Sequence, residues 1–253
     1  MQMLKKIIVS IAVACSAGLL ANIDNGFVLI TVLYNETNAE RIAEYIECFE
    51  RNRMHTSIDS IHVIYDTVKD EGNNVILDHL IQSGVAISYV QGRVPYAYCF
   101  DLANRLYPNR RIILSNADIY FNDTLTLLDR YDFTDLFFAL TRWDVRQDGS
   151  LEIFKQYNKE GKFWPDASIR SQDVWMFQTP LRAFNRSDIF MGTMQCDSRI
   201  AFQAASSGLA VINPCLTIQC CHLHLSDVRN YDKSDRYTEH HLMQGVAWSQ
   251  LPD

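Results

Sequence analysis

The sequence is short of positive charge. Its 253 residues hold 23 lysines and arginines against 30 aspartates and glutamates, which gives a formal net charge of −7. A nucleic-acid-binding domain normally shows a basic face, whereas the pI of this chain is about 5.5. The charge balance therefore excludes nucleic acid as an expected partner, and it argues against a highly anionic substrate.

Glycine and proline are also scarce, at 10 and 6 residues, and the chain contains neither an internal repeat nor a linker rich in glycine, serine or proline. With 48% hydrophobic and 21% charged residues, it has ample material for a core and no signature of disorder. Its length fits one α/β domain or a domain with a small appendage. We predict a single domain over residues 24–253.

Several common catalytic motifs are missing. The sequence contains no GxSxG motif, which excludes a hydrolase with that nucleophile elbow. It contains no CxxC pair, the spacing typical of a zinc site. The segment Leu33-Tyr34-Asn35-Glu36-Thr37 has no glycine and no lysine. Its composition counts against the Gly-rich phosphate loop of a nucleotidyltransferase or another nucleotide-binding α/β enzyme.

The N-terminus differs from the rest of the chain. Lys5 and Lys6 precede residues 7–23, which carry no charge and many small side chains. This layout is typical of a secretory signal peptide, and the apolar stretch is at the short end for a membrane anchor. Cys15 loosely resembles a lipoprotein site, and a buried first strand is the structural alternative. We expect export or anchoring through residues 1–23, hence the secretory-pathway lumen, the periplasm or a membrane.

The chain has 7 cysteines. If Cys15 is removed or lipidated, the remaining ones are compatible with disulfides in an oxidising compartment. Cys220 and Cys221 are adjacent inside an apolar run, so buried free thiols are an equal alternative. The sequence leaves this choice open.

Strand and helix patterns alternate in the first half. This alternation predicts a parallel sheet with right-handed crossovers. The second half is less regular and predicts a mixed-sheet extension. The predicted strands are 27–33, 61–65, 85–90, 111–114, 136–140, 173–177, 210–214 and 216–223, and the predicted helices are 39–54, 75–81, 96–107 and 196–207.

Polar side chains follow the predicted strands. Asp66 comes directly after the strand at 61–65, and Asp118 comes shortly after the strand at 111–114. Because ligands in open α/β sheets bind at the carboxyl ends of strands, these acids either cap turns or anchor a site.

Three segments resemble the nucleotide-sugar glycosyltransferases of the GT-A fold, and the resemblance runs from Phe27 to about Tyr231. Asn116-Ala117-Asp118 stands where that fold keeps its Asp-x-Asp motif. The run MGTMQCDSRIAFQAASSGLAVINP, residues 191–214, is similar to the "GEDxDLxxRLxxAGYxVxxxP" segment of family-2-like members. His222-Leu223-His224 closes a late strand, where several GT-A families place a histidine metal ligand.

The resemblance implies an α/β fold of the GT-A-like nucleotide-diphospho-sugar transferase type, with a parallel N-terminal half and a mixed-sheet C-terminal extension. It implies a UDP- or GDP-sugar donor and a Mn²⁺ or Mg²⁺ ion bound by Asp118 with His222 or His224. A divalent cation stabilises the charge left on a diphosphate, and imidazole ligands favour Mn²⁺. Asn116 replaces the first acid of the motif, which removes a carboxylate and leaves an amide able to bond ribose or coordinate.

An inverting transfer needs a general base for the acceptor hydroxyl. The resemblance nominates Asp197, which aligns with the second acid of "GED", while Cys196 replaces the glutamate. Aspartate is also a favoured helix N-cap, which is the structural alternative for Asp197. Asp173 is the second candidate, either as the base or as a ligand of acceptor hydroxyls.

The resemblance also implies contacts with donor and acceptor. Trp143 and Trp175 are candidate stacking platforms for sugar rings, with a core position as their alternative. The expected donor contacts are Thr31, Leu33, Tyr34, Asn35, Asp66, Arg93, Tyr96, Asn116 and Ala117, and the expected sugar or acceptor contacts are Trp143, Asp144, Trp175 and Arg199.

The sequence is thus interpreted as a metal-dependent, inverting glycosyltransferase that moves a sugar from a nucleotide-diphosphate donor to a hydroxyl of a glycan, lipid or protein acceptor. The alternative is an inactive sugar-binding or structural protein of the same fold, which Asn116 favours.

Overall fold

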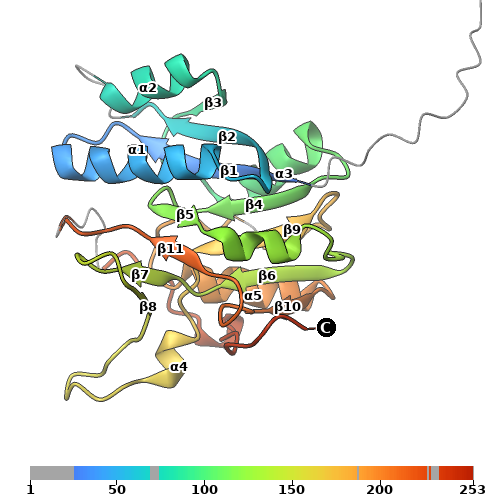
Figure 1. Cartoon of the computed structure of the whole chain (residues 1–253). Coiled ribbons are helices and arrows are strands. Elements are labelled where there is room, and N and C mark those ends of the chain that lie inside the picture. The colour runs from blue at the N-terminus through green and yellow to red at the C-terminus, as the bar shows by residue number, and fades with distance from the viewer. Residues whose placement is uncertain (1–25, 69–73, 187, 227, 229–233, 253) are drawn as a thin grey trace, which may run out of the picture.

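The computed structural model describes residues 26–252 except 69–73, 187, 227 and 229–233 (Figure 1). The predicted signal or anchor at residues 1–23, with Cys15, lies outside the described residues. Among the helices within those described ranges, none combines the length and apolarity that crossing a membrane requires.

A seven-stranded sheet forms the centre of the fold, in the order β10-β6-β9-β4-β1-β2-β3. Neighbouring strands are parallel except that β9 runs antiparallel to both β4 and β6. The predicted parallel N-terminal half and mixed C-terminal extension are therefore confirmed. The strands are β1 (Phe27–Tyr34), β2 (Ile58–Asp66), β3 (Ala86–Val90), β4 (Arg111–Ser115), β6 (Leu136–Leu140), β9 (Val174–Gln178) and β10 (Ala210–Ile212).

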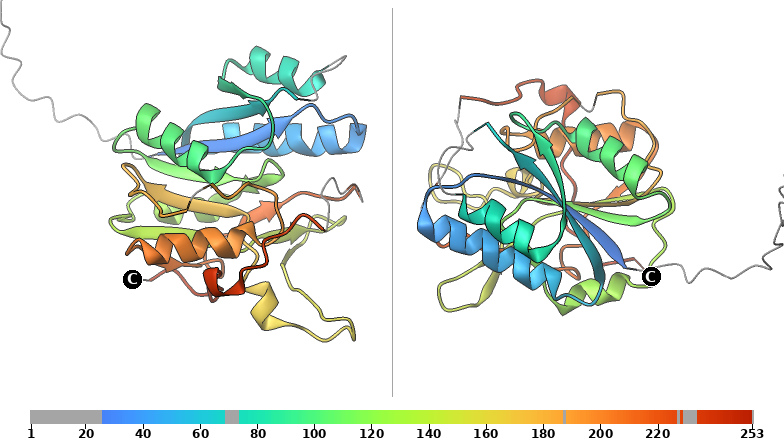
Figure 2. Two further views of the ribbon diagram at one scale, coloured as in Figure 1. Left: turned by 180° about the vertical axis from the view of Figure 1, so that it is seen from behind. Right: turned by 90° about the horizontal axis from the view of Figure 1, so that it is seen from above.

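Helices cover both faces of this sheet (Figure 2). On one face, α1 (Ala39–Arg53), α2 (Val75–Ser83) and the short 3₁₀ helix η1 (Asp123–Leu128) supply apolar side chains to a buried cluster. On the other face, α3 (Tyr96–Leu106) and α5 (Cys196–Ser206) supply a second cluster. The helices predicted from the sequence thus agree with these α-helices to within about two residues at each end.

Local signals in the sequence explain two helix boundaries. Asn38 caps α1, because its side chain accepts the backbone N–H of Arg41 at 3.0 Å. Asn74 caps α2 in the same way, and α2 ends on Gly84, whose φ of 69° is left-handed and favours glycine.

A second, four-stranded sheet has the order β5-β11-β7-β8. Its strands, β5 (Ile119–Phe121), β7 (Trp143–Val145), β8 (Leu151–Ile153) and β11 (Cys220–His222), have three residues each. Segments this short carry too little periodicity to be recognised one by one, and the sequence did not predict this sheet. A hairpin and the short helix α4 (Pro165–Ser168) follow β8, and the 3₁₀ helix η2 (His240–Leu242) lies near the C-terminus.

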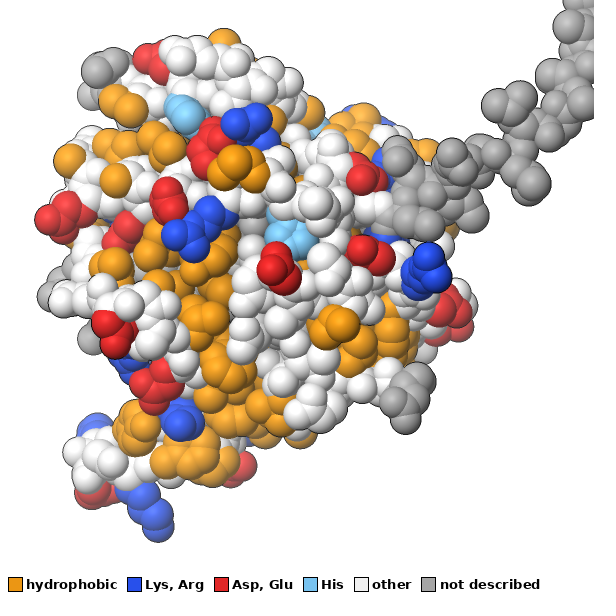
Figure 3. All heavy atoms as spheres, viewed as in Figure 1, with side chains coloured by type: hydrophobic (Ala, Val, Ile, Leu, Met, Phe, Trp, Pro, Cys, Tyr) orange, Lys and Arg blue, Asp and Glu red, His pale blue; other side chains and the backbone are white. Residues whose placement is uncertain are grey.

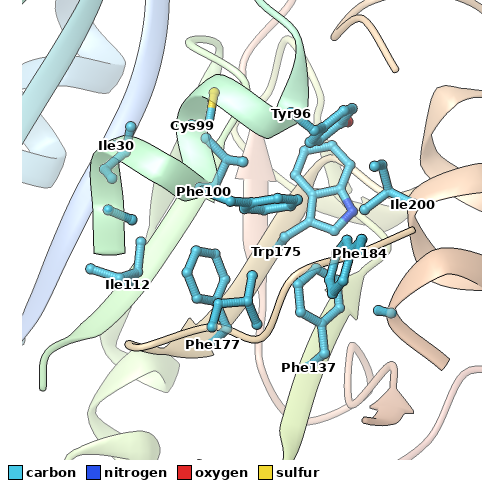
Figure 4. Packing of buried hydrophobic residues seen from close by; sticks show 14 of the residues in the cluster. Ile30, Tyr96, Cys99, Phe100, Ile112, Phe137, Trp175, Phe177, Phe184 and Ile200 are labelled. Carbon is cyan, nitrogen blue, oxygen red and sulfur yellow. The ribbon is translucent and has the colours of Figure 1, made fainter. Parts of the chain in front are cut away.

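The second core cluster contains two residues that were predicted to contact ligands, Trp175 and Tyr96 (Figure 4). Trp175 is 1% exposed, and its ring lies 4.9 Å from that of Tyr96, which is fully buried. Both side chains pack among Phe100, Phe177 and other apolar residues of this face. Both side chains therefore belong to the hydrophobic core. The predicted sugar contact of Trp175 and the predicted donor contact of Tyr96 are wrong, because neither side chain is accessible to a ligand.

Asn52 joins α1 to strand β5 of the second sheet. Its buried side chain donates to the Ile119 carbonyl at 2.8 Å and accepts the Phe121 N–H at 3.0 Å, so it holds strand β5 by both backbone groups. Asn52→Ala leaves these two groups without partners, and we expect a loss of about 2–4 kcal/mol in unfolding free energy. Urea denaturation measures this, and Arg53→Ala on the exposed side of the same helix should leave stability nearly unchanged. An equal response of both variants would contradict this role.

All cysteines within the described residues are buried free thiols. Burial raises the pKa of the thiols of Cys215 and Cys221 to about 12 and about 11, so they stay protonated at neutral pH. Of the two alternatives left open by the sequence, the structure has the free thiols.

Candidate functional site

The candidate site lies where several strands end on the same side of the molecule. Asn116 and Asp118 follow β4, and Thr141 to Asp144 follow β6. Because β9 is antiparallel, its first residue pairs with the last residues of both β4 and β6. Asp173, just before β9, therefore lies at the carboxyl ends of its neighbours, where open α/β sheets place ligands.

His222 joins this edge through the second sheet. Strand β11 lies between β5 and β7, with His222 in register with Ile119 on one side and Asp144 on the other. This register places the His222 ring between Asp118 and Asp144. Its Nε2 lies 3.2 Å from Asp118 Oδ2, and its Nδ1 lies 2.8 Å from Asp144 Oδ1.

The three residues predicted to bind a metal come together. Ligand atoms of Asp118, His222 and His224 all lie within 4.8 Å of one another. His224 Nδ1 lies 3.9 Å from Asp118 Oδ2, and the two imidazole rings are 5.5 Å apart. These are distances at which one cation can be held by all three side chains.

The residues present fit a divalent ion. Oδ1 of Asp118 is buried and has no hydrogen-bond partner among the residues that the structure describes, which leaves an anionic oxygen for a ligand. The donor set is one carboxylate and two imidazoles, which suits Mn²⁺ or another transition metal better than Mg²⁺. Asp144 contacts the other nitrogen of His222, as a second carboxylate commonly does behind a metal-binding histidine.

Charged side chains surround Asp118. Burial by itself raises its pKa, but His222 and Arg41 outweigh that effect and hold the pKa well below its usual range. His222 is affected in the opposite sense: burial lowers its pKa, while Asp118 and Asp144 raise it to about 9. The cluster is therefore an ionised network that already contains positive charge.

Arg41 supplies part of that charge. The buried guanidinium pairs with Asp118 Oδ2 and, at 2.7 Å, with Glu44 one turn further along α1. Glu44 in turn accepts the backbone N–H groups of Leu225 and Ser226 at 2.7 and 2.8 Å. Arg41 and Glu44 thus tie the start of α1 to the segment that carries His224.

A second acidic group lies beside the first. Asp173 accepts from Asn116 Nδ2 at 3.0 Å and from Arg142 Nη1 at 3.1 Å. Arg142 also donates through Nε to Asp144 Oδ1 at 2.8 Å. We name Asp118, His222 and His224 the metal-type cluster. Arg142 therefore connects Asp173 to this cluster through Asp144, which contacts His222.

Asp197 completes the acidic group. Its pKa is raised to about 7, first by burial and then by the negative charge of Asp173. The Cys196 thiol donates to its Oδ1 at 3.1 Å. The helix begins after Gln195, which has a left-handed φ of 72° and no capping bond, so Asp197 is not the N-cap. The structural alternative for Asp197 is thus wrong.

The expected donor contacts are only partly assembled. Asp66 Oδ1 accepts the N–H groups of Val68 and Gly92 at 2.9 and 2.8 Å, which is the strand-end turn. Arg93 donates to Thr193 at 2.9 Å and pairs with Asp235, away from Asp118. The structure brings neither of them into contact with the metal-type cluster.

The remaining donor contacts belong to β1 and the loop behind it. Thr31 donates to the Ser115 carbonyl at 3.1 Å, which holds β1 to β4 just before Asn116 and Ala117. The Leu33 side chain is 2% exposed in the core, so we correct its role to packing. The Tyr34 hydroxyl lies 3.2 Å from that of Tyr45. Asn35, the next residue, is buried and stays a predicted donor contact.

The predicted acceptor contacts divide in the same way. Asp144 contacts His222 and Arg142, as described, and stays a predicted acceptor contact. Trp143 is half-buried, and its indole N–H donates to the Cys215 carbonyl at 2.8 Å. This hydrogen bond fixes the orientation of the indole ring. Arg199 is 1% exposed and pairs with Glu239, which corrects its predicted contact with the sugar or the acceptor.

Sequence reasoning missed Arg41 and Glu44. Their only sequence signal is that they stand at i and i+3, on a face of α1 that also contains buried Cys48. Charged residues at helical spacing normally indicate a solvated face, so nothing in the pattern pointed to this ion pair.

No protein-family model matches the sequence, and no curated protein matches it either. Solved structures do. A mannosyltransferase from Pyrobaculum calidifontis, in complex with GDP-Man and Mn²⁺, is 15% identical with a TM-score of 0.48 over 81% of this chain and 58% of that one. GalNAc-T7, solved with UDP, GalNAc and Mn²⁺, is 10% identical with a TM-score of 0.50 over 80% of this chain and 44% of that one.

A third match is 4-diphosphocytidyl-2C-methyl-D-erythritol synthase from Anaerococcus prevotii, 13% identical with a TM-score of 0.40 over 83% of this chain and 95% of that one. This chain spans about half the length of the two transferases. At such identities the likeness shows the fold alone. The fold is that of the GT-A-like nucleotide-sugar transferases, as the sequence resemblance implied.

Proposed function

We propose that this protein is a glycosyltransferase that takes a sugar from a nucleotide-diphosphate donor and transfers it to an acceptor hydroxyl. One observation carries the proposal: a metal-type donor set and an acid with a raised pKa are joined at one sheet edge through His222, Asp144, Arg142 and Asp173. The GT-A-like fold supports it, because the edge is formed by the carboxyl ends of β4 and β6.

Asp118, His222 and His224 would hold the metal, which when bound supplies a Lewis acid that stabilises the negative charge of the departing nucleoside diphosphate. Arg41 adds a fixed positive charge beside Asp118. Asp144 orients the His222 ring through Nδ1, and Arg142 holds Asp144 in place. We propose Mn²⁺ rather than Mg²⁺, because two of the three ligands are imidazoles.

We assign the general base to Asp197. The acceptor hydroxyl oxygen forms the new bond to the anomeric carbon, the bond from that carbon to the phosphate oxygen breaks, and the hydroxyl proton moves to the Asp197 carboxylate. A base works best when its pKa is near the working pH, and burial with the neighbouring Asp173 raises the pKa of Asp197 to about 7. Asp173 accepts from Asn116 and from the Arg142 guanidinium, which hold it in place beside Asp197. A single displacement of this kind inverts the anomeric carbon.

The acceptor and the location are parts of the proposal that rest on the sequence. We propose a glycan, lipid or protein acceptor and an exported or membrane-anchored protein, on the basis of residues 1–23.

An inactive sugar-binding protein is the second candidate. Asn116 replaces an acid, and its side chain is turned to Asp173 rather than to Asp118. Arg41 already neutralises the remaining carboxylate of the motif. A protein with this arrangement can bind a sugar nucleotide through Arg41 without a metal.

A thermal-shift screen of UDP, GDP, CMP and their sugar conjugates, with and without Mn²⁺, tests the proposal. A ligand at 100 times its Kd stabilises by about 2.7 kcal/mol. We expect one nucleotide to stabilise only when Mn²⁺ is present, and Asp118→Asn to abolish that effect. Asp123→Asn, an exposed acid close by in the sequence, is the matched control and should respond like the wild type. Stabilisation that is independent of Mn²⁺ would favour the second candidate, and no shift with any nucleotide would contradict both.

A further inference from the structure

A hairpin projects from the body directly after β8 (Figure 1). We name residues 154–166 the arm. Its strands are joined by two backbone hydrogen bonds of 2.8 Å, from Asn158 N–H to the Lys162 carbonyl and from Trp164 N–H to the Gln156 carbonyl. The Asn158 side chain accepts the N–H groups of Glu160 and Lys162, and Gly161 takes a φ of 75°. The tip therefore has a defined shape rather than a loose one.

The arm exposes large aromatic side chains. Tyr157 is 53% exposed, Phe163 is 38% exposed and Trp164 is 50% exposed. Monomeric proteins usually bury such rings, and a group of them on a projecting element indicates a surface that meets another phase or molecule. In the space-filling view the part below the main body shows orange, blue and red side chains together (Figure 3).

The arm contains three lysines together with two exposed acids, Glu160 and Asp166. Lys155, Lys159 and Lys162 are the lysines within the described residues, and every other described cation is an arginine or a histidine. The three are exposed. Arginine suits rigid ion pairs, whereas lysine has a flexible apolar stem that extends along a membrane while its ammonium stays in the headgroup layer. Because the three lysines outnumber Glu160 and Asp166, the arm has a net charge of +1 on a chain of net charge −7, and this excess of positive charge complements an anionic surface.

The faces of the hairpin favour a lipid surface over a glycan. Tyr157 and Phe163 form a cross-strand pair and share one face, and the Phe163 ring lies 6.2 Å from that of Trp248. Trp164 follows Phe163 and therefore points to the opposite face. A stacked glycan needs rings on one face, whereas a tip immersed in a lipid interface uses rings on both. Tryptophan and tyrosine are enriched at this interface.

We propose that the arm inserts its tip into the headgroup layer of an anionic lipid bilayer. Its aromatic rings enter the interface, and its lysines meet the acidic headgroups. This proposal does not depend on the transferase function. Since β8 leads from β7, which carries Asp144, into the arm, an arm seated in a bilayer holds the candidate site beside the lipid surface.

The test uses the full chain with vesicles of phosphatidylcholine alone or with about 30% phosphatidylglycerol, which gives the vesicle a negative surface potential. Co-sedimentation should show binding to the anionic vesicles that is at least about tenfold tighter, since each basic residue near an anionic surface strengthens binding several-fold. Added salt should weaken it. Lipids brominated on their acyl chains should quench tryptophan fluorescence, and Trp164→Phe should remove most of that quenching. This second readout follows the arm itself, whatever residues 1–23 contribute.

Two arm variants and two matched controls complete the design. Neutralising the lysines should lower affinity for the anionic vesicles about tenfold, and removing the aromatics should lower affinity for both vesicle types. Controls that remove equal charge or equal exposed apolar surface elsewhere should bind like the wild type. The arm variants are K155Q/K159Q/K162Q and Y157S/F163S/W164S, and the controls are R53Q/R105Q/R130Q and M54S/L106S/L127S.

Three results would overturn the proposal. One is the absence of vesicle binding. Another is vesicle binding that the arm variants leave intact and that does not quench Trp164, since this would assign the contact to another part of the chain. The third is binding of anionic oligosaccharides, with polygalacturonate fragments as the probe, that the lysine variant loses while vesicles are not bound. That result would make the arm a glycan surface, formed around the open hollow of about 450 Å³ that Asn158, Lys162, Phe163, Trp164 and Pro165 line.

Discussion

Replacing Asp197 by asparagine is expected to lower kcat by about 10²- to 10⁴-fold while the protein stays folded and binds the donor nucleotide. The amide has nearly the same shape as the carboxylate but cannot take the acceptor proton. Asp197 is half-buried, and the loss of a charge that is already costly to bury should not destabilise the fold. Initial rates with a competent donor and acceptor measure the effect, and the thermal shift with nucleotide and Mn²⁺ is the internal control. Asp101→Asn, an exposed acid on α3, should keep full activity.

The pH dependence distinguishes this role from a structural one. A general base acts only when ionised, and Asp197 ionises above its pKa of about 7. The wild-type kcat/KM should therefore fall about tenfold for each pH unit below 7 and level off above it. Asp197→Asn should lose this dependence. A pH-independent wild-type rate between pH 5 and pH 8, about one to two units on either side of the pKa, would contradict the assignment.

Asp173→Asn separates the two candidate bases. Burial and the charge of Asp173 together raise the pKa of Asp197, so removing that charge lowers the pKa and moves the acidic limb to lower pH. Arg142, freed from Asp173, acts in the same direction. If Asp173 is instead the base, this variant loses activity at every pH and no shifted limb remains. The direction of the shift thus assigns the proton acceptor.

Much of the fold follows from local sequence patterns. The strands β1 to β4 and their helices carry enough apolar periodicity to be recognised separately, and their alternation determines a parallel sheet. The second sheet has strands of three residues, and its pairing depends on contacts between segments about 100 residues apart, such as Ile119 with His222. No window of sequence contains that information.

The site shows the same division. Asp118, His222 and His224 were predicted from the resemblance to GT-A glycosyltransferases, which places metal ligands at these positions close to strand ends. Arg41, by contrast, comes from the start of α1 and meets Asp118 across 77 positions of sequence. The prediction for Trp175 was wrong for another reason. Whether an aromatic side chain on a central strand packs in the core or contacts a ligand depends on the residues around it in the folded chain, and the sequence does not show them. Long-range ion pairs and the choice of buried face are decided by tertiary packing.

Replacing Arg41 by methionine is expected to lower the unfolding free energy of the metal-free protein by about 3–5 kcal/mol. The change leaves Asp118 buried with one cationic partner fewer, and Glu44 loses its 2.7 Å ion pair. His222 and Arg41 together hold the pKa of Asp118 low against the effect of burial, so without Arg41 that pKa rises. Urea denaturation measures the loss. Arg53→Met, which removes an exposed arginine from the same helix, should leave stability nearly unchanged.

The response of this variant to Mn²⁺ decides what Arg41 does. A metal ion bound by Asp118 restores positive charge at the same carboxylate, so Mn²⁺ should stabilise Arg41→Met more than it stabilises the wild type. If Mn²⁺ stabilises both, Arg41 and the metal act together, with the guanidinium on Oδ2 and the ion on the unpaired Oδ1. If Mn²⁺ stabilises the variant alone, the guanidinium occupies the place of the metal, and the natural protein neutralises its ligand with an arginine. The carboxylate at the end of β4 is the same in both cases, and the identity of the cation that faces it separates the metal-dependent transferase from the metal-free sugar-nucleotide binder.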